Sequence, residues 1–114
     1  MHELGIASAI LDAVRSEADK RPGVHVTKVG VRIGALSGVE PEALSFGFSA
    51  LVQGSDLEPL ALVIELVPRR QRCPACEFTF DIAEDNLACP RCASGETLLA
   101  GGEELDLAYL EVED

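Results

Sequence analysis

Residues 73–92 read CPACEFTFDIAEDNLACPRC, with two Cys-x-x-Cys pairs separated by twelve residues. Two residues between cysteines let both sulfurs of one turn reach the same ion, and two such turns complete the tetrahedral sulfur set that zinc favours. Proline in the second position of each pair presets the turn. The segment is too short for a hydrophobic core of its own, so a bound metal would supply its folding energy. The predicted zinc ligands are Cys73, Cys76, Cys89 and Cys92.

Two other chemistries are compatible with these cysteines. Iron adopts the same four-sulfur geometry in rubredoxin-like electron carriers, and a single pair could carry thiol–disulfide chemistry. Neither pair begins a convincing helix, and acidic side chains flank both pairs, which disfavours a reactive thiol. Four thiolates also fill the coordination shell and leave no position for a substrate, so a catalytic zinc is not expected.

The chain on either side of the cysteines shows regular hydrophobic patterns. Apolar residues recur with helical spacing over residues 4–19 and alternate with polar residues over 25–34. Pro41 suits the first position of a second helix. The apolar stripe of that helix would contain Leu44, Phe48, Leu51 and Val52. Residues 60–67 and 105–112 are predicted to form two further strands.

Two helices and three strands must share one core to bury these faces. The predicted fold class is therefore α+β, with two helices packed on a three-stranded sheet and a small inserted zinc-ribbon-like lobe. The final strand needs a partner in the sheet, because a lone strand is not stable. The predicted domains are a discontinuous α+β domain, residues 1–70 plus 99–114, and a zinc-binding domain, residues 71–98.

The charge of the chain excludes several classes of partner. The chain contains nine Lys and Arg and twenty Asp and Glu, which gives a net charge of −11. Residues 73–114 contain eleven of the acidic residues and a single basic one, Arg91. An acidic surface repels phosphate, so neither nucleic acid nor a membrane is an expected partner. Because the N-terminus does not resemble a signal peptide and no stretch reaches the roughly 20 apolar residues of a membrane helix, a cytoplasmic protein is expected.

The N-terminus offers a second, different metal site. The α-amine of Met1, the backbone nitrogen of His2 and the His2 imidazole can lie in one plane around a metal, and Glu3 could add an oxygen or another backbone nitrogen. Ni(II) and Cu(II) accept such square-planar nitrogen sets, whereas Zn(II) gains nothing from them. A histidine at position 2 is nevertheless often only an exposed side chain, so this pattern alone does not establish a site.

The ordered combination of features resembles the HypA/HybF family of hydrogenase nickel-incorporation proteins. The resemblance covers essentially the whole chain: Met1-His2-Glu3-Leu4 opening a helix, the strand from Val29 to Gly34, the two cysteine pairs and the last strand. It implies a nickel metallochaperone that carries Ni(II) towards the large subunit of [NiFe] hydrogenase, usually with a partner GTPase, and in some bacteria towards urease.

The resemblance also implies roles for individual residues. His2 would be the principal nickel ligand, assisted by Met1 and Glu3, and residues 1–70 plus 99–114 would form the nickel-binding domain. Ni(II) would be labile cargo, Zn(II) a structural ion at the four cysteines, and the protein a monomer or homodimer. Glu40 precedes the second helix where some family members have an acidic residue linked to the nickel site, although a carboxylate is also favoured at a helix N-terminus.

The sequence therefore leaves three classes of function open. The first is a nickel metallochaperone, the second a zinc-ribbon interaction module without nickel delivery, and the third a small iron-thiolate redox carrier. An enzyme is not expected, because the chain has neither a Ser/His/Asp set nor a glycine-rich phosphate loop of recognised spacing.

Overall fold

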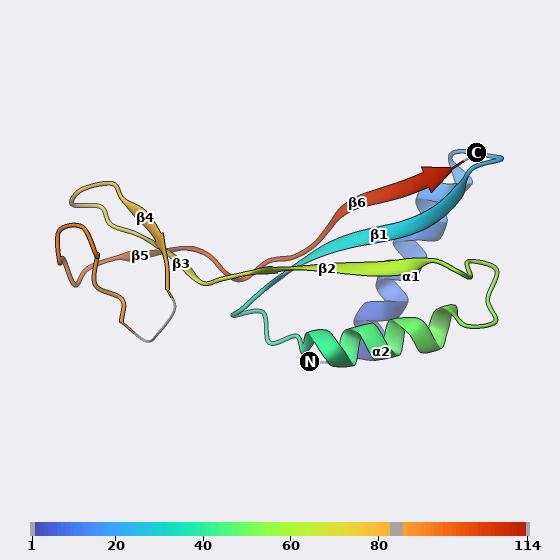
Figure 1. The fold of residues 1–114 in the computed structure, drawn as a ribbon, viewed down its shortest axis with the longest axis horizontal. Helices are drawn as coiled ribbons and strands as arrows, with labels where there is room; N and C mark the ends of the chain where they lie inside the picture. Colours follow the sequence, from blue (N-terminus) through green and yellow to red (C-terminus); the bar gives the residue numbers. More distant parts are fainter. Residues whose placement is uncertain (1, 83–85, 114) are drawn as a thin grey trace. The chain divides into compact units, whose positions relative to one another are not determined.

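The computed structural model describes residues 2–82 and 86–113. The elements in chain order are α1 (Glu3–Asp19), β1 (His25–Gly34), α2 (Pro41–Val52), β2 (Ala61–Val67), β3 (Arg70–Arg72), β4 (Thr79–Asp81), β5 (Leu98–Gly101) and β6 (Leu105–Glu113) (Figure 1). No helix within the described ranges is long and apolar enough to span a membrane.

The chain forms two compact units. The first contains Met1–Arg32, Gly38–Glu65 and Asp106–Asp114, and the second contains Ile33–Ser37 and Leu66–Leu105.

The three long strands form one sheet in the order β2-β1-β6. Strands β1 and β2 run in the same direction and are joined through α2, whereas β6 runs the opposite way beside β1 (Figure 1). Parallel neighbours need a crossover connection of this kind, because a tight turn cannot join them. The last strand, β6, therefore pairs with β1, as expected from the sequence analysis, which required a partner for it in the sheet.

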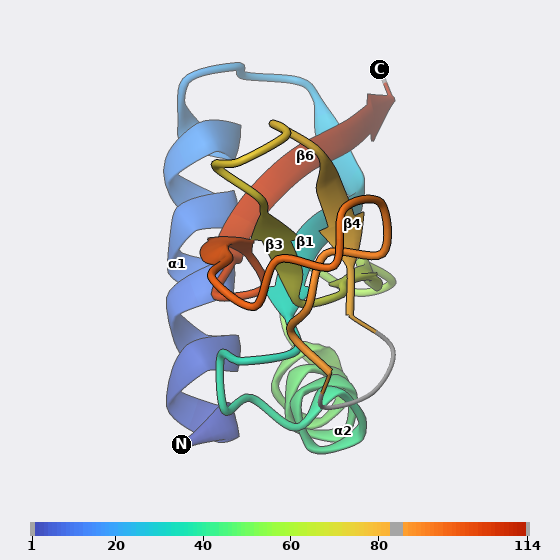
Figure 2. The ribbon, with the colours of Figure 1, turned by 90° about the vertical axis from the view of Figure 1, so that its left-hand side faces the viewer.

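The core of the first unit lies between the two helices and one face of this sheet. Figure 2 shows α1 running alongside the strands while α2 is seen end on. The buried apolar side chains include Ala7, Ile10, Leu11 and Val14 of α1, Val29 and Val31 of β1, and Leu44, Phe48 and Val52 of α2. Full burial of each large side chain contributes about 1.5–3 kcal/mol to folding. The prediction of two helices packed on a three-stranded sheet is confirmed.

The second unit contains a smaller antiparallel sheet in the order β4-β3-β5. Gln71 at its centre pairs with Phe80 of β4 and Leu99 of β5, and a register shift lies between Arg70 and Gln71. The first cysteine pair follows β3, and the second lies between β4 and β5. This arrangement confirms the predicted zinc-ribbon-like insertion and adds three short strands that the sequence analysis did not predict.

Candidate metal centre

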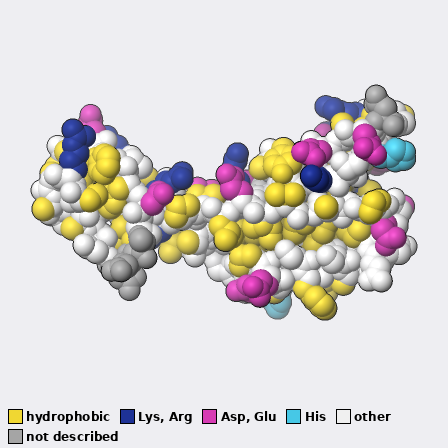
Figure 3. All heavy atoms as spheres, viewed as in Figure 1, with side chains coloured by type: hydrophobic (Ala, Val, Ile, Leu, Met, Phe, Trp, Pro, Cys, Tyr) yellow, Lys and Arg dark blue, Asp and Glu magenta, His cyan; other side chains and the backbone are white. Residues whose placement is uncertain are grey.

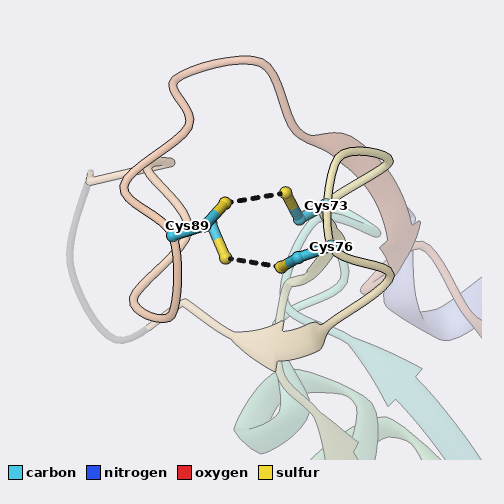
Figure 4. Close-up of side chains that lie close together, drawn as sticks. Cys73, Cys76 and Cys89 are labelled. Atoms are coloured by element: carbon cyan, nitrogen blue, oxygen red, sulfur yellow. Dashed lines mark hydrogen bonds between the residues drawn. The ribbon is translucent and has the colours of Figure 1, made fainter.

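The four cysteines converge within the second unit. All four sulfur atoms lie within 4.8 Å of one another. The Sγ atoms of Cys73 and Cys92 are 3.5 Å apart, and those of Cys76 and Cys89 are 3.6 Å apart. Figure 4 shows Cys73 and Cys76 facing the turn that carries Cys89. Each pair therefore supplies half of a single cluster.

Both cysteine turns have the same backbone geometry. In the first, the N–H of Cys73 donates to the carbonyl of Phe78 (2.8 Å), and the N–H of Glu77 donates to the carbonyl of Cys73 (2.7 Å). In the second turn, the N–H of Cys89 donates to the carbonyl of Ser94 (2.9 Å), and the N–H of Ala93 donates to the carbonyl of Cys89 (2.8 Å).

The residue after each pair has a left-handed backbone. Glu77 has φ of 62° and Ala93 has φ of 64°. Residues other than glycine rarely adopt this conformation, because it crowds the Cβ atom. Two turns that share an uncommon backbone at equivalent positions indicate two copies of one metal-binding knuckle.

The pKa values of the four thiols shift in opposite directions, downward for Cys73 and Cys89 and upward for Cys76 and Cys92. Burial raises the pKa of Cys73, but hydrogen bonds from the N–H groups of Cys76 and Ala75 and from the Cys92 thiol outweigh it and lower that pKa to about 7. For Cys92, the N–H of Ser94 favours the thiolate, yet interaction with Cys73 and burial raise the pKa to about 12. Four thiols this close cannot all lose their protons unless a cation replaces them, as a coordinated metal does.

The sulfur positions match a tetrahedral metal shell. With metal–sulfur bonds of about 2.3 Å, the edge of a regular tetrahedron is about 3.8 Å. The Cys73–Cys92 and Cys76–Cys89 sulfur distances of 3.5 and 3.6 Å lie slightly below this length. Four thiolates and no fifth ligand position form a closed structural site rather than a catalytic one.

A buried polar network supports the cluster. The side chain of Gln71 is only 2% exposed. Its amide nitrogen donates to the Thr97 hydroxyl (3.0 Å), which in turn donates to the backbone carbonyl of Leu87 (2.6 Å). The network thus joins the centre of the small sheet to the segment that leads into Cys89. The sequence analysis missed it, because the three residues are distant in the chain. In β3 only the central residue, Gln71, is buried, and a strand of three residues is too short to reveal that from the sequence.

Replacing Thr97 by valine is expected to weaken this support. The change removes the hydroxyl and leaves the Gln71 amide buried without its partner, a loss worth about 1–3 kcal/mol. We expect a lower unfolding temperature of the second unit and faster loss of metal to a chromogenic chelator. Thr79→Val is the matched control, because Thr79 is exposed on β4 and its side chain makes no hydrogen bond to any residue in the described part of the chain. Equal metal loss from both variants would show that the network does not support the site.

The N-terminal residues belong to the first unit and lie far from the cysteines in sequence. Met1 lies outside the described residues. His2 is exposed at the N-cap of α1, where its side chain makes no capping hydrogen bond. Its backbone carbonyl accepts the N–H of Ile6 (3.1 Å), the first bond of the helix. The imidazole is therefore not engaged in holding the helix.

Glu3 and Glu40 meet at the start of α2. The Glu3 carboxylate accepts the backbone N–H of Glu40 (3.2 Å), and this bond holds the pKa of Glu3 below its ordinary value. The Glu40 carboxylate accepts the N–H of Glu42 (3.1 Å) and so caps α2. The geometry thus gives Glu40 a capping role and links the beginning of α1 to the beginning of α2.

Fold and site together define a class: a small α+β protein with an inserted ribbon that carries a closed four-cysteine metal site. A family model described as "Hydrogenase/urease nickel incorporation, metallochaperone, hypA" matches residues 1–112. The hydrogenase maturation factor HypA of Albidiferax ferrireducens is 38% identical over 113 residues, which cover 99% of this chain and 100% of that protein. HypA of Chlorobaculum parvum is 37% identical with the same coverage.

Solved structures show the same fold. A solution structure of a HypA protein has a TM-score of 0.70 and 25% identity, covering 97% of this chain and 95% of that one. The Ni metallochaperone HypA from Helicobacter pylori has a TM-score of 0.64, with 97% of each chain covered; at 23% identity it supports the fold alone.

The chain belongs to the HypA family of nickel metallochaperones, which act in hydrogenase maturation. The family resemblance inferred from the sequence is confirmed. Members of this family are metallochaperones rather than enzymes, as the sequence analysis also predicted.

Proposed function

We propose that the chain binds one Ni(II) at its N-terminus and delivers it to the large subunit of [NiFe] hydrogenase, with a nickel-delivery GTPase as helper, in the cytoplasm. The observation that carries this proposal is His2, an exposed imidazole free of capping bonds at the first turn of α1 in a nickel-chaperone family. The Met1 amine and the backbone nitrogen of Glu3 would complete the ligand set.

The start of α1 suits coordination by backbone nitrogens. The first four N–H groups of a helix have no partner within the helix. Because the first helical bond here comes from Ile6, the amides of His2 and Glu3 can release their protons to solvent and bind a square-planar metal through nitrogen without breaking the helix. The Glu3 carboxylate already accepts a hydrogen bond from the Glu40 backbone, so the backbone nitrogen of Glu3 is the more available of its two possible metal ligands.

We further propose that Zn(II) occupies the four-cysteine cluster as a structural ion. The donor set is all sulfur, the spacing suits a tetrahedron, and the shell is closed. The two sites would then differ in purpose: the terminal site would release its metal, since a chain end frays at little cost. The zinc site would be permanent and would hold the ribbon in shape.

A transfer assay tests delivery directly. The chain loaded with one equivalent of Ni(II) is mixed with nickel-free hydrogenase large subunit, with and without the GTPase, and nickel in each separated protein is measured by mass spectrometry. We expect nickel to move to the large subunit while zinc stays on this chain. Nickel that remains bound to this chain under both conditions would contradict the proposed delivery.

A further inference from the structure

The solvent-facing side of α2 is unusually apolar. Phe46, at its centre, is 79% exposed. Ala43 and Ala50 are also exposed, and their spacing of three and four residues from Phe46 places all three on one side of the helix. No charged residue occurs between Ala43 and Val52. Figure 3 shows hydrophobic side chains reaching the surface over α2 and between α2 and β2.

Leu4 of α1 extends this surface. Its side chain is 57% exposed. A Cβ atom built on Gly47 would lie 3.4 Å from Leu4 Cδ1, so Leu4 rests directly against α2. Gly47 lies four residues after Ala43 and three before Ala50, which puts Leu4 beside the two alanines. We call Leu4, Ala43, Phe46 and Ala50 the α2 patch.

The charges around the α2 patch are predominantly negative. Residues 38–65 contain five carboxylates and no Lys or Arg. Glu42 lies one turn before Phe46 on the same side of α2 and is exposed. Two of the other acids are paired with arginines, Asp56 with Arg15 (2.7 Å) and Glu65 with Arg32 (2.8 Å). Among the described residues, Glu40, Glu42 and Glu58 have no basic partner, so the net charge stays negative. The surroundings of the patch therefore attract a cationic surface.

The same charges disfavour a second copy of this chain as the occupant. In a two-fold dimer each patch would contact the same patch of the other copy, and both copies would bring a net negative charge to the contact. Like charges at an interface cost free energy, whereas Lys or Arg on a different protein would complement them. An exposed aromatic ring between two small residues is the kind of anchor that fills a pocket at the centre of an interface.

We propose that the α2 patch is the docking surface for a protein partner with an apolar pocket, rimmed by Lys or Arg, that receives Phe46. This inference rests on the proposed function, because the partner would be one of the two proteins in nickel delivery. The bond between Glu3 and the Glu40 backbone and the contact of Leu4 with α2 hold the N-terminal turn against this helix. A partner seated on the patch is thereby held close to His2.

Binding measurements on metal-free, purified proteins test the docking surface. Labelled wild-type chain and its variants are titrated by fluorescence anisotropy with the GTPase and, separately, with the hydrogenase large subunit. For the partner that binds, Phe46→Ser is expected to raise Kd roughly 30-fold, as for an interface anchor. Glu42→Lys should also raise Kd and make it less sensitive to salt. Leu66→Ser is the matched control, since Leu66 is 64% exposed and lies outside the patch.

The outcomes separate docking from nickel binding. Far-UV circular dichroism and a nickel titration should be the same for Phe46→Ser and wild type, because Phe46 is neither buried nor a proposed ligand. Three results would overturn the docking surface: no binding of wild type to either protein, an unchanged Kd for Phe46→Ser, or a wild-type dimer in sedimentation that Phe46→Ser dissociates. A wild-type chain that binds a partner but not nickel would refute the proposed function while leaving the docking surface intact.

Discussion

Replacing His2 by alanine is expected to abolish specific nickel binding while leaving the fold and the cysteine site unchanged. His2 is the proposed imidazole ligand, and its side chain makes no capping bond to α1. Loss of a residue that merely orients a metal ligand typically costs 10–100-fold in affinity, so loss of the ligand itself should cost at least about 100-fold. Nickel titration of both proteins by calorimetry, with zinc content measured in parallel, checks the expectation.

His25→Ala is the matched control, since His25 is the other histidine in the chain and is exposed at the start of β1. We expect this variant to bind nickel as the wild type does. Equal nickel affinity in the His2→Ala protein would remove the N-terminal site from the proposed function. A His2→Ala protein that also loses zinc would instead show that the two sites are not independent.

The long elements were predictable because their patterns are local. Helical spacing predicted residues 4–19, and the structure has α1 at Glu3–Asp19. Alternation predicted 25–34, the bounds of β1, because every second residue faces the helices and must be apolar. In α2 the pattern held for the buried residues Leu44 and Phe48 but misjudged Leu51, which lies in the last turn and is 36% exposed.

The small sheet of the second unit was not predictable in the same way. Strands β3, β4 and β5 contain only three or four residues each, too few to display a period. Their pairing is fixed by contacts between distant residues, such as Gln71 with Thr97. The cysteine cluster could still be predicted, because the spacing of each pair is set by the ion and by one turn of chain.

The N-terminal region was predictable only in part. The sequence placed His2 and Glu3 together as neighbours, but it could not show that the Glu3 carboxylate bonds to the Glu40 backbone 37 residues later. The exposure of Phe46 was equally hidden, because a phenylalanine beside an apolar stripe ordinarily belongs to the core. Both features depend on how α1 meets α2, which no local pattern encodes. The ligand set of Met1, His2 and Glu3 and the domain limits drawn from the sequence stay predictions.

Replacing Cys73 by serine is expected to unfold the second unit while the first unit keeps its structure. Among the described residues, the contacts around the small sheet of the second unit are few: the Gln71–Thr97–Leu87 bonds, two exposed ion pairs, the Phe78–Phe80 stack with ring centres 6.1 Å apart, and the Arg91 guanidinium 5.9 Å from the Phe78 ring. A structural zinc contributes about 10–16 kcal/mol in small zinc-finger peptides. Without the metal, these contacts cannot offset the conformational entropy of the ordered chain.

Ala75→Ser is the control, because it adds the same hydroxyl to the same turn at an exposed position that is not a ligand. Amide hydrogen exchange is measured for wild type, both variants and wild type treated with a strong chelator. In Cys73→Ser and in chelated wild type, fast exchange should spread over Arg70–Arg72 and Leu98–Gly101, while the amides of α1 and β1 stay protected. Because the first unit has its own buried core from both helices and the long sheet, its protection does not depend on the cysteines. Protection of β3 and β5 that survives metal removal would show that the ribbon folds without its ion, and the four cysteines would then need another explanation.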